Sequence, residues 1–521
     1  MEKQHLRPTH LTQNEVAELF HVAPVTVFNW VKEGLLELDE NRCVTEKSLR
    51  RFQKGYAGKT KLHARANKQL KDGHDNNEVN AVMQQALGAK SFDSNLGDRY
   101  EAMLSESFKN REGVFYTPMT IVDDMMREVK ADATTLFLDP CCGSGNFLVK
   151  AVEKGVSPHN LFGYDTDPIA VMIARRRIQE LTGVEPEHVV CADFLDRCPS
   201  LDIKFDLVFT NPPWGKKLNK AERQQYAERY KTGLSTDTCS LFFLAALSVL
   251  RHGGRAGLLF PDSFFKIAVF EGIRNVLLQQ TLERIIDHGK PFKNLYSAVS
   301  VLFRKYPPEP TGTVLCHYHH KSFERVQQGF MKMPRHNINY WTCPDEMQFI
   351  EELLQMSSLT LKGRAAWGLG IVTGNNAKMC KRSWRKGLVA VYRGKEILPG
   401  RLKAAQYYIN PEDFPRYQQM APLSLFQAPE KLVYRFISNK LVFHCDTHQR
   451  FILNSANMLV LDEDFPVDAK TMAKLLNSPL SNWLFQQLFH THKVLRGDLE
   501  MLPIVTDSAT HRRFDLLNLG W

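Results

Sequence analysis

Four consecutive residues, Asn211-Pro212-Pro213-Trp214, could activate an exocyclic amine for methylation. The amino nitrogen of adenine is a poor nucleophile because its lone pair is delocalised into the ring. The Asn211 side-chain oxygen and the Pro212 carbonyl could each accept one hydrogen of that nitrogen, leaving its lone pair facing an electrophile. The prolines have a fixed φ and no N–H to donate, and Trp214 offers a flat face on which an extruded base could stack. An ordinary strand-ending turn has the same composition, so the tetrad alone leaves both interpretations open.

The segments around the tetrad predict an open α/β sheet. The apolar run 205–210 predicts a buried strand, so the tetrad would lie at a strand's carboxyl end, where such sheets bind ligands. Segment 136–147 predicts a strand, a glycine turn and the start of a helix. Gly143 and Gly145 in that turn would let a ligand approach the backbone, and the helix start would supply free N–H groups. A GxG turn by itself is a weak signal.

Acidic residues at two further strand ends strengthen the prediction of a nucleotide-like ligand. Asp165 ends the strand after the glycine turn, where a carboxylate is expected to accept the hydroxyls of a ribose. Asp193 and Phe194 end a third strand. There they could receive an adenine amino group and pack an aromatic ring against the base.

The chain at this point resembles the TaqI-like N6-adenine DNA methyltransferases, with motifs in the gamma order: 113–118, the glycine turn, the two acids and then the tetrad. The resemblance implies S-adenosylmethionine as cofactor. It also implies a second stacking aromatic at Phe292, for which a core role stays equally open. Cofactor contacts are implied for Thr117, Pro118, Asp139, Cys141, Gly143, Gly145, Asn146, Phe147, Asp165, Asp193 and Phe194, and catalytic roles for Asn211, Pro212, Pro213, Trp214 and Phe292.

Two positions depart from the family pattern. Trp214 stands where the family more often has Tyr or Phe, a change with which a stacking role is compatible. Cys141-Cys142 stands where Ala-Cys is usual. We expect two packed thiols there and no cysteine nucleophile, because amine methylation needs no covalent intermediate.

Composition predicts a cytoplasmic, multidomain protein with an affinity for polyanions. The 521 residues hold 67 Lys and Arg against 57 Asp and Glu, a net charge of +10. Ten cysteines show no CxxC pair or zinc-like spacing, so no metal site is expected. No signal peptide and no apolar run of the ~20 residues needed to span a bilayer is evident, so no membrane association is expected. DNA binding would place the protein at the nucleoid.

A small helical module precedes the methyltransferase motifs. Thr12 and Glu15 predict a capping box at a first helix, and a second helix would begin near Pro24. The spacing resembles a helix-turn-helix of the MerR or excisionase type, with Thr26 and Asn29 in the major groove and Lys32 near phosphate. A protein-docking or dimerising module is the alternative. Apolar positions expected to be buried are Val16, Ala17, Leu19, Phe20, Val25, Val27, Phe28 and Val31.

An acid-free run from Lys47 to Lys71 holds nine Lys or Arg residues, among them Arg50, Arg51 and Lys54. A flexible linker and a phosphate-contacting segment are equally open interpretations, and one segment could serve as both.

The predicted organisation is a helix-turn-helix module at 1–55, a basic linker at 56–77, a Rossmann-like methyltransferase domain at 78–306 and a mixed α+β target-recognition domain at 307–521. Runs 254–261, 282–287 and 299–303 complete a predicted sheet of seven strands. Segment 370–376 resembles the start of the TaqI-like recognition region, which implies DNA contacts for Thr373 and Asn375.

We therefore expect S-adenosylmethionine-dependent methylation of the N6 amine of an adenine flipped from a specific double-stranded DNA sequence. The setting would be restriction-modification, phage defence or epigenetic marking, and a separate restriction or defence subunit could exist. The same tetrad would also suit an RNA base or a protein glutamine amide. From another class, the chain could be a DNA-binding or assembly subunit whose methyltransferase fold has lost turnover.

Overall fold

The structure is a computed structural model that divides into two compact units, each described here by itself. The first comprises Met1–Pro261 and His288–Tyr306, and the second Asp262–Asp287 and Pro307–Trp521. The structure describes residues 10–20, 24–32, 35–55, 77–88, 95–104, 115–215, 218–233, 235, 237–292, 297–356 and 359–517. Within these residues no helix is both long and apolar enough to cross a bilayer.

The N-terminal module contains three helices and a short strand pair around a small aromatic core. The predicted capping box is confirmed: the Thr12 amide donates to the Glu15 carboxylate at 2.7 Å, and the Glu15 amide donates to the Thr12 hydroxyl at 3.2 Å. Trp30 packs on Phe52 with ring centroids 4.6 Å apart. The elements are β1 (His10–Leu11), α1 (Gln13–Leu19), α2 (Pro24–Lys32), β2 (Val44–Thr45) and α3 (Glu46–Gly55).

Two of the expected core positions of this module were wrong. Leu19 is 49% exposed and Phe28 is 56% exposed, whereas Val16, Ala17 and Val27 are buried as predicted. The three helices enclose a narrow core, so only one stripe of each short helix is covered.

A mixed sheet forms the centre of the first unit, and the second unit contains three strands of its own that lie side by side. In the first unit the strand order is β9-β7-β6-β3-β4-β5, and in the second it is β11-β10-β8. Within the described residues, the six strands of the first unit and β8 of the second correspond to the seven predicted strands, and β10 and β11 were not predicted. The strands are β3 (Phe137–Asp139), β4 (Leu161–Asp165), β5 (Val189–Cys191), β6 (Phe205–Thr210), β7 (Leu250–Pro261), β8 (Thr281–Asp287), β9 (Ala298–Arg304), β10 (Thr313–Tyr318) and β11 (Lys321–Val326).

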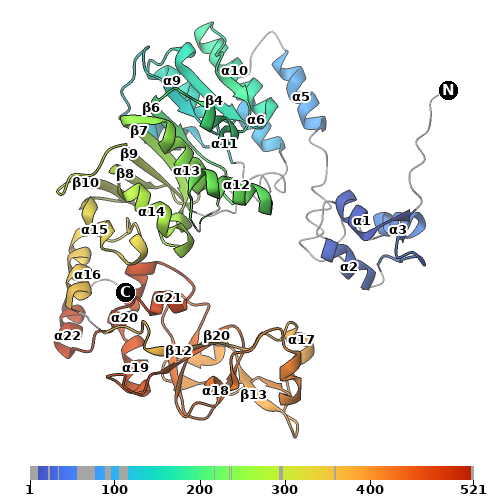
Figure 1. The fold of residues 1–521 in the computed structure, drawn as a ribbon, viewed down its shortest axis with the longest axis vertical. Helices are drawn as coiled ribbons and strands as arrows, with labels where there is room; N and C mark the ends of the chain where they lie inside the picture. The colour runs from blue at the N-terminus through green and yellow to red at the C-terminus, as the bar shows by residue number, and fades with distance from the viewer. Residues whose placement is uncertain are drawn as a thin grey trace. The chain divides into compact units, whose positions relative to one another are not determined.

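Helices cover both faces of the sheet in the first unit (Figure 1). Adjacent residues of β7 show this: Leu259 belongs to the core formed with α8, α9 and α10, whereas Phe260 packs against Phe243 of α13. Strands buried on both faces have near-continuous apolar sequences, as β6 does. The helices of this part are α5 (Asn77–Leu87), α6 (Leu96–Met103), α8 (Met119–Met126), α9 (Asn146–Glu153), α10 (Pro168–Thr182), α11 (Phe194–Arg197), α12 (Lys220–Tyr230) and α13 (Thr238–Val249).

β6 lies between β3 and β7 and runs parallel to both. β3, β4, β5 and β6 all run parallel, so their carboxyl ends lie at one edge of the sheet. The residues at this edge are Asp139, Asp165 and those that follow Cys191 and Thr210. This edge carries the candidate site.

The second unit adds three small sheets, with orders β12-β20-β17-β18, β16-β13-β19 and β14-β15, and several helices. Its strands are β12 (Ala365–Leu369), β13 (Val389–Tyr392), β14 (Ile397–Leu398), β15 (Arg401–Leu402), β16 (Tyr407–Ile409), β17 (Lys431–Arg435), β18 (Phe443–Asp446), β19 (Phe451–Ile452) and β20 (Ala456–Leu461). Its helices are α14 (Glu271–Leu278), α15 (Gln327–Met331), α16 (Pro344–Met356), α17 (Asn376–Met379), α18 (Leu423–Phe426), α19 (Ala469–Leu476), α20 (Pro479–Phe489), α21 (Arg496–Leu499) and α22 (Ser508–Leu517).

Candidate active site

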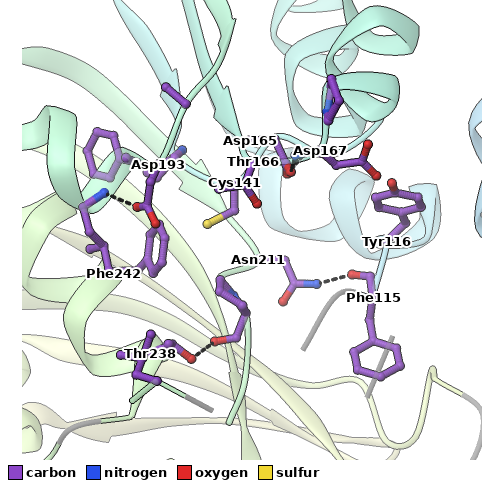
Figure 2. Close-up of a pocket in the computed structure, with 18 of the residues that line it drawn as sticks. Phe115, Tyr116, Cys141, Asp165, Thr166, Asp167, Asp193, Asn211, Thr238 and Phe242 are labelled. Carbon is purple, nitrogen blue, oxygen red and sulfur yellow. Dashed lines mark hydrogen bonds between the residues drawn. The ribbon is translucent and has the colours of Figure 1, made fainter. Parts of the chain in front are cut away.

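A cavity of about 370 Å³ opens at the carboxyl edge of β3, β4, β5 and β6 (Figure 2). A recess of about 30 Å³ adjoins it and shares five lining residues with it. The cavity is of the size that small-molecule sites occupy. The residues common to both spaces are Phe115, Tyr116, Cys141, Gly143 and Asn211.

The glycine turn between β3 and α9 requires glycine at two positions. Gly143 has φ +46°, and a Cβ there would lie 2.6 Å from a ring carbon of Tyr116. Gly145 has φ +86° and precedes α9, and a Cβ there would lie 2.9 Å from the Cβ of Ala174. The turn therefore packs closely against two neighbours. Of the two glycines, Gly143 lines both the cavity and the recess.

Two carboxyl groups, one buried and one partly buried, accept hydrogen bonds from amides of this turn. The Asp165 carboxylate accepts hydrogen bonds from the amides of Gly143 and Asp167, each at 2.9 Å, and burial raises its pKa to about 6. Asp139 accepts from the Cys141 amide at 3.1 Å, and burial raises its pKa to about 7. Asp165 lines the cavity, whereas Asp139 lines the recess. Asp165 is thus the carboxylate of this pair that faces the larger space.

Asp193 and Phe194 line the opposite part of the cavity. The Asp193 carboxylate caps α11 by accepting from the Leu195 amide at 2.8 Å. Phe194 is 1% exposed and lies parallel to Phe242 of α13, with ring centroids 6.3 Å apart. This arrangement places an acid beside an apolar ring at the cavity.

Hydrogen bonds join the segments 115–118 and 146–147, which contain several predicted site residues. The Asn146 amide donates to the Thr117 carbonyl at 2.8 Å and accepts from the Arg177 guanidinium at 2.6 Å. Pro118 precedes α8 and lines neither space, and Phe147 is buried in the core while bordering the recess. Asn146 is therefore placed to position the Thr117 segment.

Asn211 presents an unused acceptor to the cavity. Its side-chain NH₂ donates to the Phe115 carbonyl at 2.8 Å, which fixes the orientation of the amide (Figure 2). Its Oδ1 is buried and has no hydrogen-bond partner in the described part of the chain. The Pro213 carbonyl accepts the Thr238 hydroxyl at 2.6 Å, and within the described ranges no hydrogen bond is formed to the Pro212 carbonyl.

Trp214 and Phe292 form an aromatic cluster beside Asn211. The Trp214 indole N–H donates to the Leu259 carbonyl at 3.2 Å, and its ring meets Phe292 edge-on at 5.6 Å. Phe292 also packs against Phe115 at 5.6 Å and is 6% exposed. Pro212, Trp214 and Phe292 are not among the residues that line the cavity.

Cys142 is buried, as expected, whereas Cys141 is only partly buried and lines both the cavity and the recess. Burial raises the pKa of each thiol well above its usual range, so both are held as neutral thiols. A neutral buried thiol is a poor nucleophile.

Several cavity residues were not predicted from the sequence. Tyr100 of α6 donates its hydroxyl to Asp167 at 2.7 Å. Tyr116 has a buried hydroxyl without a partner among described residues, and so does the Asn80 side-chain oxygen on α5. Tyr116 lies inside a segment that was quoted for the resemblance, but Asn80 lies on a helix with no distinguishing motif. The other unpredicted lining residues include Leu218, Tyr226, Thr238 and Phe242.

The predicted DNA contacts of the N-terminal module are only partly described. Thr26 is half-buried on α2, and the side chains of Asn29, Lys32 and Lys54 lie outside the described residues. Arg50 and Arg51 form exposed ion pairs with Glu46 and Glu37. Exposed pairs of this kind contribute little energy, so both guanidinium groups could exchange a carboxylate for a phosphate.

Thr373 and Asn375 in the second unit mainly stabilise the start of α17. The Thr373 hydroxyl is buried and donates to Asn376 at 2.6 Å. The Asn375 side chain caps α17 by accepting from the Lys378 amide at 3.1 Å, although the residue is exposed.

Comparison with known proteins identifies the family. Residues 91–343 match the N-6 DNA methylase family, and residues 389–504 match the TaqI-like C-terminal specificity domain. The type II methyltransferase M.VspI of Vibrio sp. (strain 343) is 40% identical over 388 residues, which cover 74% of this chain and 95% of that protein. The chain belongs to the N-6 DNA methylase family. It is a DNA methyltransferase of the kind found in restriction-modification systems, and its family implies S-adenosylmethionine as methyl donor.

More distant proteins share parts of this methyltransferase. The EcoEI type I methylase subunit of Escherichia coli is 25% identical over 226 residues, 40% of this chain and 45% of that subunit. The DNA-bound type IIL restriction-modification enzyme MmeI superposes with a TM-score of 0.54 at 11% identity, over 80% of this chain and 72% of that enzyme. The similarity to MmeI concerns the fold alone. The N-terminal module and α5 precede the matched residues 91–343.

Proposed function

We propose that this methyltransferase transfers the methyl group of S-adenosylmethionine to the N6 amine of an adenine that has been flipped out of double-stranded DNA. The observation that carries the proposal is the buried, unpartnered Oδ1 of Asn211 at the cavity. An unsatisfied buried acceptor costs free energy, about 1–3 kcal/mol, and is retained where a ligand will use it.

The Asn211 side chain presents an unpartnered acceptor to a substrate. Because its NH₂ is held by the Phe115 carbonyl, the oxygen is the atom presented to an incoming amine. The Pro212 carbonyl is the proposed second acceptor, since the Pro213 carbonyl is already used by Thr238. Two acceptors on the two N6 hydrogens would draw them from the ring plane and expose the nitrogen lone pair.

When bound, the cofactor supplies an electrophilic methyl group on a sulfonium. The amine lone pair would form the new N–C bond as the S–C bond broke, so positive charge would move from sulfur to N6 and one amine proton would then be lost to solvent. Asn211 and the Pro212 carbonyl stabilise that charge because both present oxygen dipoles to it. The reaction is an in-line displacement in which positioning provides much of the acceleration.

Each part of the cofactor is assigned to the cavity residues whose chemistry suits it. We assign Asp165 to the ribose hydroxyls, Asp193 with Phe194 to the adenine, and the recess beside Gly143, Thr117 and Asn146 to the methionine part. The glycine turn fits this group because Gly143 lines both the cavity and the recess, so the backbone there is open to a ligand.

Trp214 and Phe292 are proposed to receive the flipped base after a change of side-chain position. Stacking on Trp214 would offset part of the few kcal/mol spent on unstacking. An RNA base, a protein glutamine amide, or a role as an inactive DNA-binding subunit are alternatives. The TaqI-like specificity match and the intact acceptor at Asn211 favour DNA methylation over each of them.

The decisive experiment is chemical identification of the product. Double-stranded DNA is incubated with the protein and isotopically labelled S-adenosylmethionine, digested to nucleosides and separated by mass spectrometry. We expect label in N6-methyladenine. Label only in a cytosine, in RNA or in protein, or no label at all, would contradict the proposal.

The biological setting is part of the same proposal. We place the protein in restriction-modification, phage defence or epigenetic marking at the nucleoid, with a separate restriction subunit as a candidate partner. The N-terminal module, residues 1–55, is proposed to bind DNA as a helix-turn-helix, joined through the basic segment 56–77 to the methyltransferase domain at 78–306 and the recognition domain at 307–521.

A further inference from the structure

An exposed basic loop in the second unit carries one tryptophan. The loop, residues 380–388 and hereafter the Trp384 loop, joins α17 to β13. Trp384 is 64% exposed. The surrounding sequence from 353 to 395 contains no Asp or Glu. The exposed basic residues in and next to the loop are Lys378, Lys381, Arg382, Arg385 and Lys386.

Backbone hydrogen bonds hold the Trp384 loop to a neighbouring strand near its start and form a turn near its end. Lys381 and Tyr408 exchange two backbone hydrogen bonds, at 2.8 and 2.9 Å. Cys380 is buried, and the Leu388 amide donates to the Arg385 carbonyl at 3.0 Å. The side chains therefore project from a defined turn. α17 and β13 lie at the opposite end of this unit from α22 (Figure 1).

The charges of the loop are not neutralised by neighbouring acids. Lys378, Arg382 and Arg385 have no ion pair within the described ranges of the chain. Other arginines of this unit do: Arg393 pairs with Glu396 at 2.8 Å, and Arg496 pairs with Glu500 at 2.8 Å. A concentration of unpaired cations in one loop costs self-repulsion unless an anion is bound.

We propose that the Trp384 loop is a direct contact to duplex DNA, in which the flanking Arg and Lys side chains bind phosphates and Trp384 packs on a base or sugar. The proposal rests on DNA as the substrate. Phosphates of a duplex are a polyanion that several cations on one loop can contact, and an aromatic ring can add apolar contact with a base edge in a groove, such as a thymine methyl group. A protein partner is kept as an outcome of the test, because protein interfaces are depleted in lysine but enriched in arginine and tryptophan.

The test compares two loop variants with matched controls in the full-length protein. Trp384→Ala is paired with Leu516→Ala, which removes another exposed apolar side chain of the second unit. The double variant Arg382→Gln/Arg385→Gln is paired with Lys470→Gln/Lys474→Gln, two exposed cations on α19. Each protein is titrated with one duplex over a range of salt concentrations, and S-adenosylmethionine affinity is measured separately to report on folding.

We expect Trp384→Ala to raise the Kd for the duplex by roughly tenfold with an unchanged salt slope. The double variant should lower the magnitude of the slope of log K against log salt by about 1.8, because each lost phosphate contact contributes about 0.9. Both controls should bind as the wild type does, and cofactor affinity should be unchanged throughout.

Loop variants that match their controls in both Kd and salt slope would overturn this inference. A loop variant whose defect appears with single-stranded RNA or a protein and not with the duplex would also overturn it. Failure of the proposed adenine methylation is a separate outcome. It would appear as the absence of N6-methyladenine in DNA treated with the wild-type protein, whether or not the loop variants lose affinity for the duplex.

Discussion

Replacing Asn211 by alanine should abolish most methyl transfer while leaving the protein folded and able to bind its cofactor. The substitution removes the Oδ1 acceptor and one hydrogen bond, that from Nδ2 to the Phe115 carbonyl. Loss of that bond costs about 1 kcal/mol of folding stability, and removal of an already unsatisfied buried oxygen offsets part of it. Catalysis should suffer more, because the oxygen acts where positive charge develops.

The size of the catalytic effect follows from comparable electrostatic contacts. Removing one preorganised group of this kind lowers kcat by about 10²–10³-fold, or about 2.7–4 kcal/mol. Single-turnover methylation of duplex DNA at saturating S-adenosylmethionine measures the chemical step, and calorimetry measures cofactor affinity. The expected result is a large fall in the first quantity and little change in the second.

Asn80→Ala is the matched control, because it removes a second unpartnered amide oxygen from the same cavity. Asn80 lies on α5, which packs on α10 beside the Asp165 end of the site. We expect this variant to weaken cofactor binding with the single-turnover rate nearly intact at saturating cofactor. The mechanism would be refuted if Asn211→Ala methylated DNA at a rate close to wild type, or if both variants lost only cofactor affinity.

Three other predictions follow from individual contacts. Because burial raises the pKa of Asp165 to about 6, S-adenosylmethionine affinity should fall as the pH is lowered through about 6, where the carboxylate becomes protonated, and calorimetry should find that dependence absent in Asp165→Asn. Lys431→Ala should lower the free energy of unfolding of the second unit by about 3–5 kcal/mol in urea titrations, because the buried Asp446, 2.6 Å away, would keep only Arg450 as a cationic partner; wild-type stability would contradict this. Deleting residues 1–72 should weaken DNA binding and flatten its salt dependence while leaving the methylated nucleoside unchanged; superimposable salt slopes would instead favour a protein-docking module.

Local sequence determined much of the first unit. The apolar run before Asn211, the glycine turn at 143–145 and the acids at strand ends are short-range patterns with direct backbone meaning, so the strands and their polar ends were predictable. The capping box at Thr12 and Glu15 was predictable for the same reason. The burial of Phe28 was predicted wrongly, because helical periodicity identifies an apolar face but not how much of it a neighbouring helix will cover.

Tertiary structure decided which groups of the site are free to act. Sequence places an oxygen on Asn211, but only its contact with the Phe115 carbonyl, which comes from a segment 96 residues earlier, makes that oxygen the unpartnered atom. Asn80 enters the cavity because α5 packs on α10, a long-range contact that no local motif encodes. Hydrogen-bond satisfaction is a property of the assembled chain. The sequence therefore determined the chemical groups available to this methyltransferase, and the packing of distant segments decided which of them remain open to a ligand.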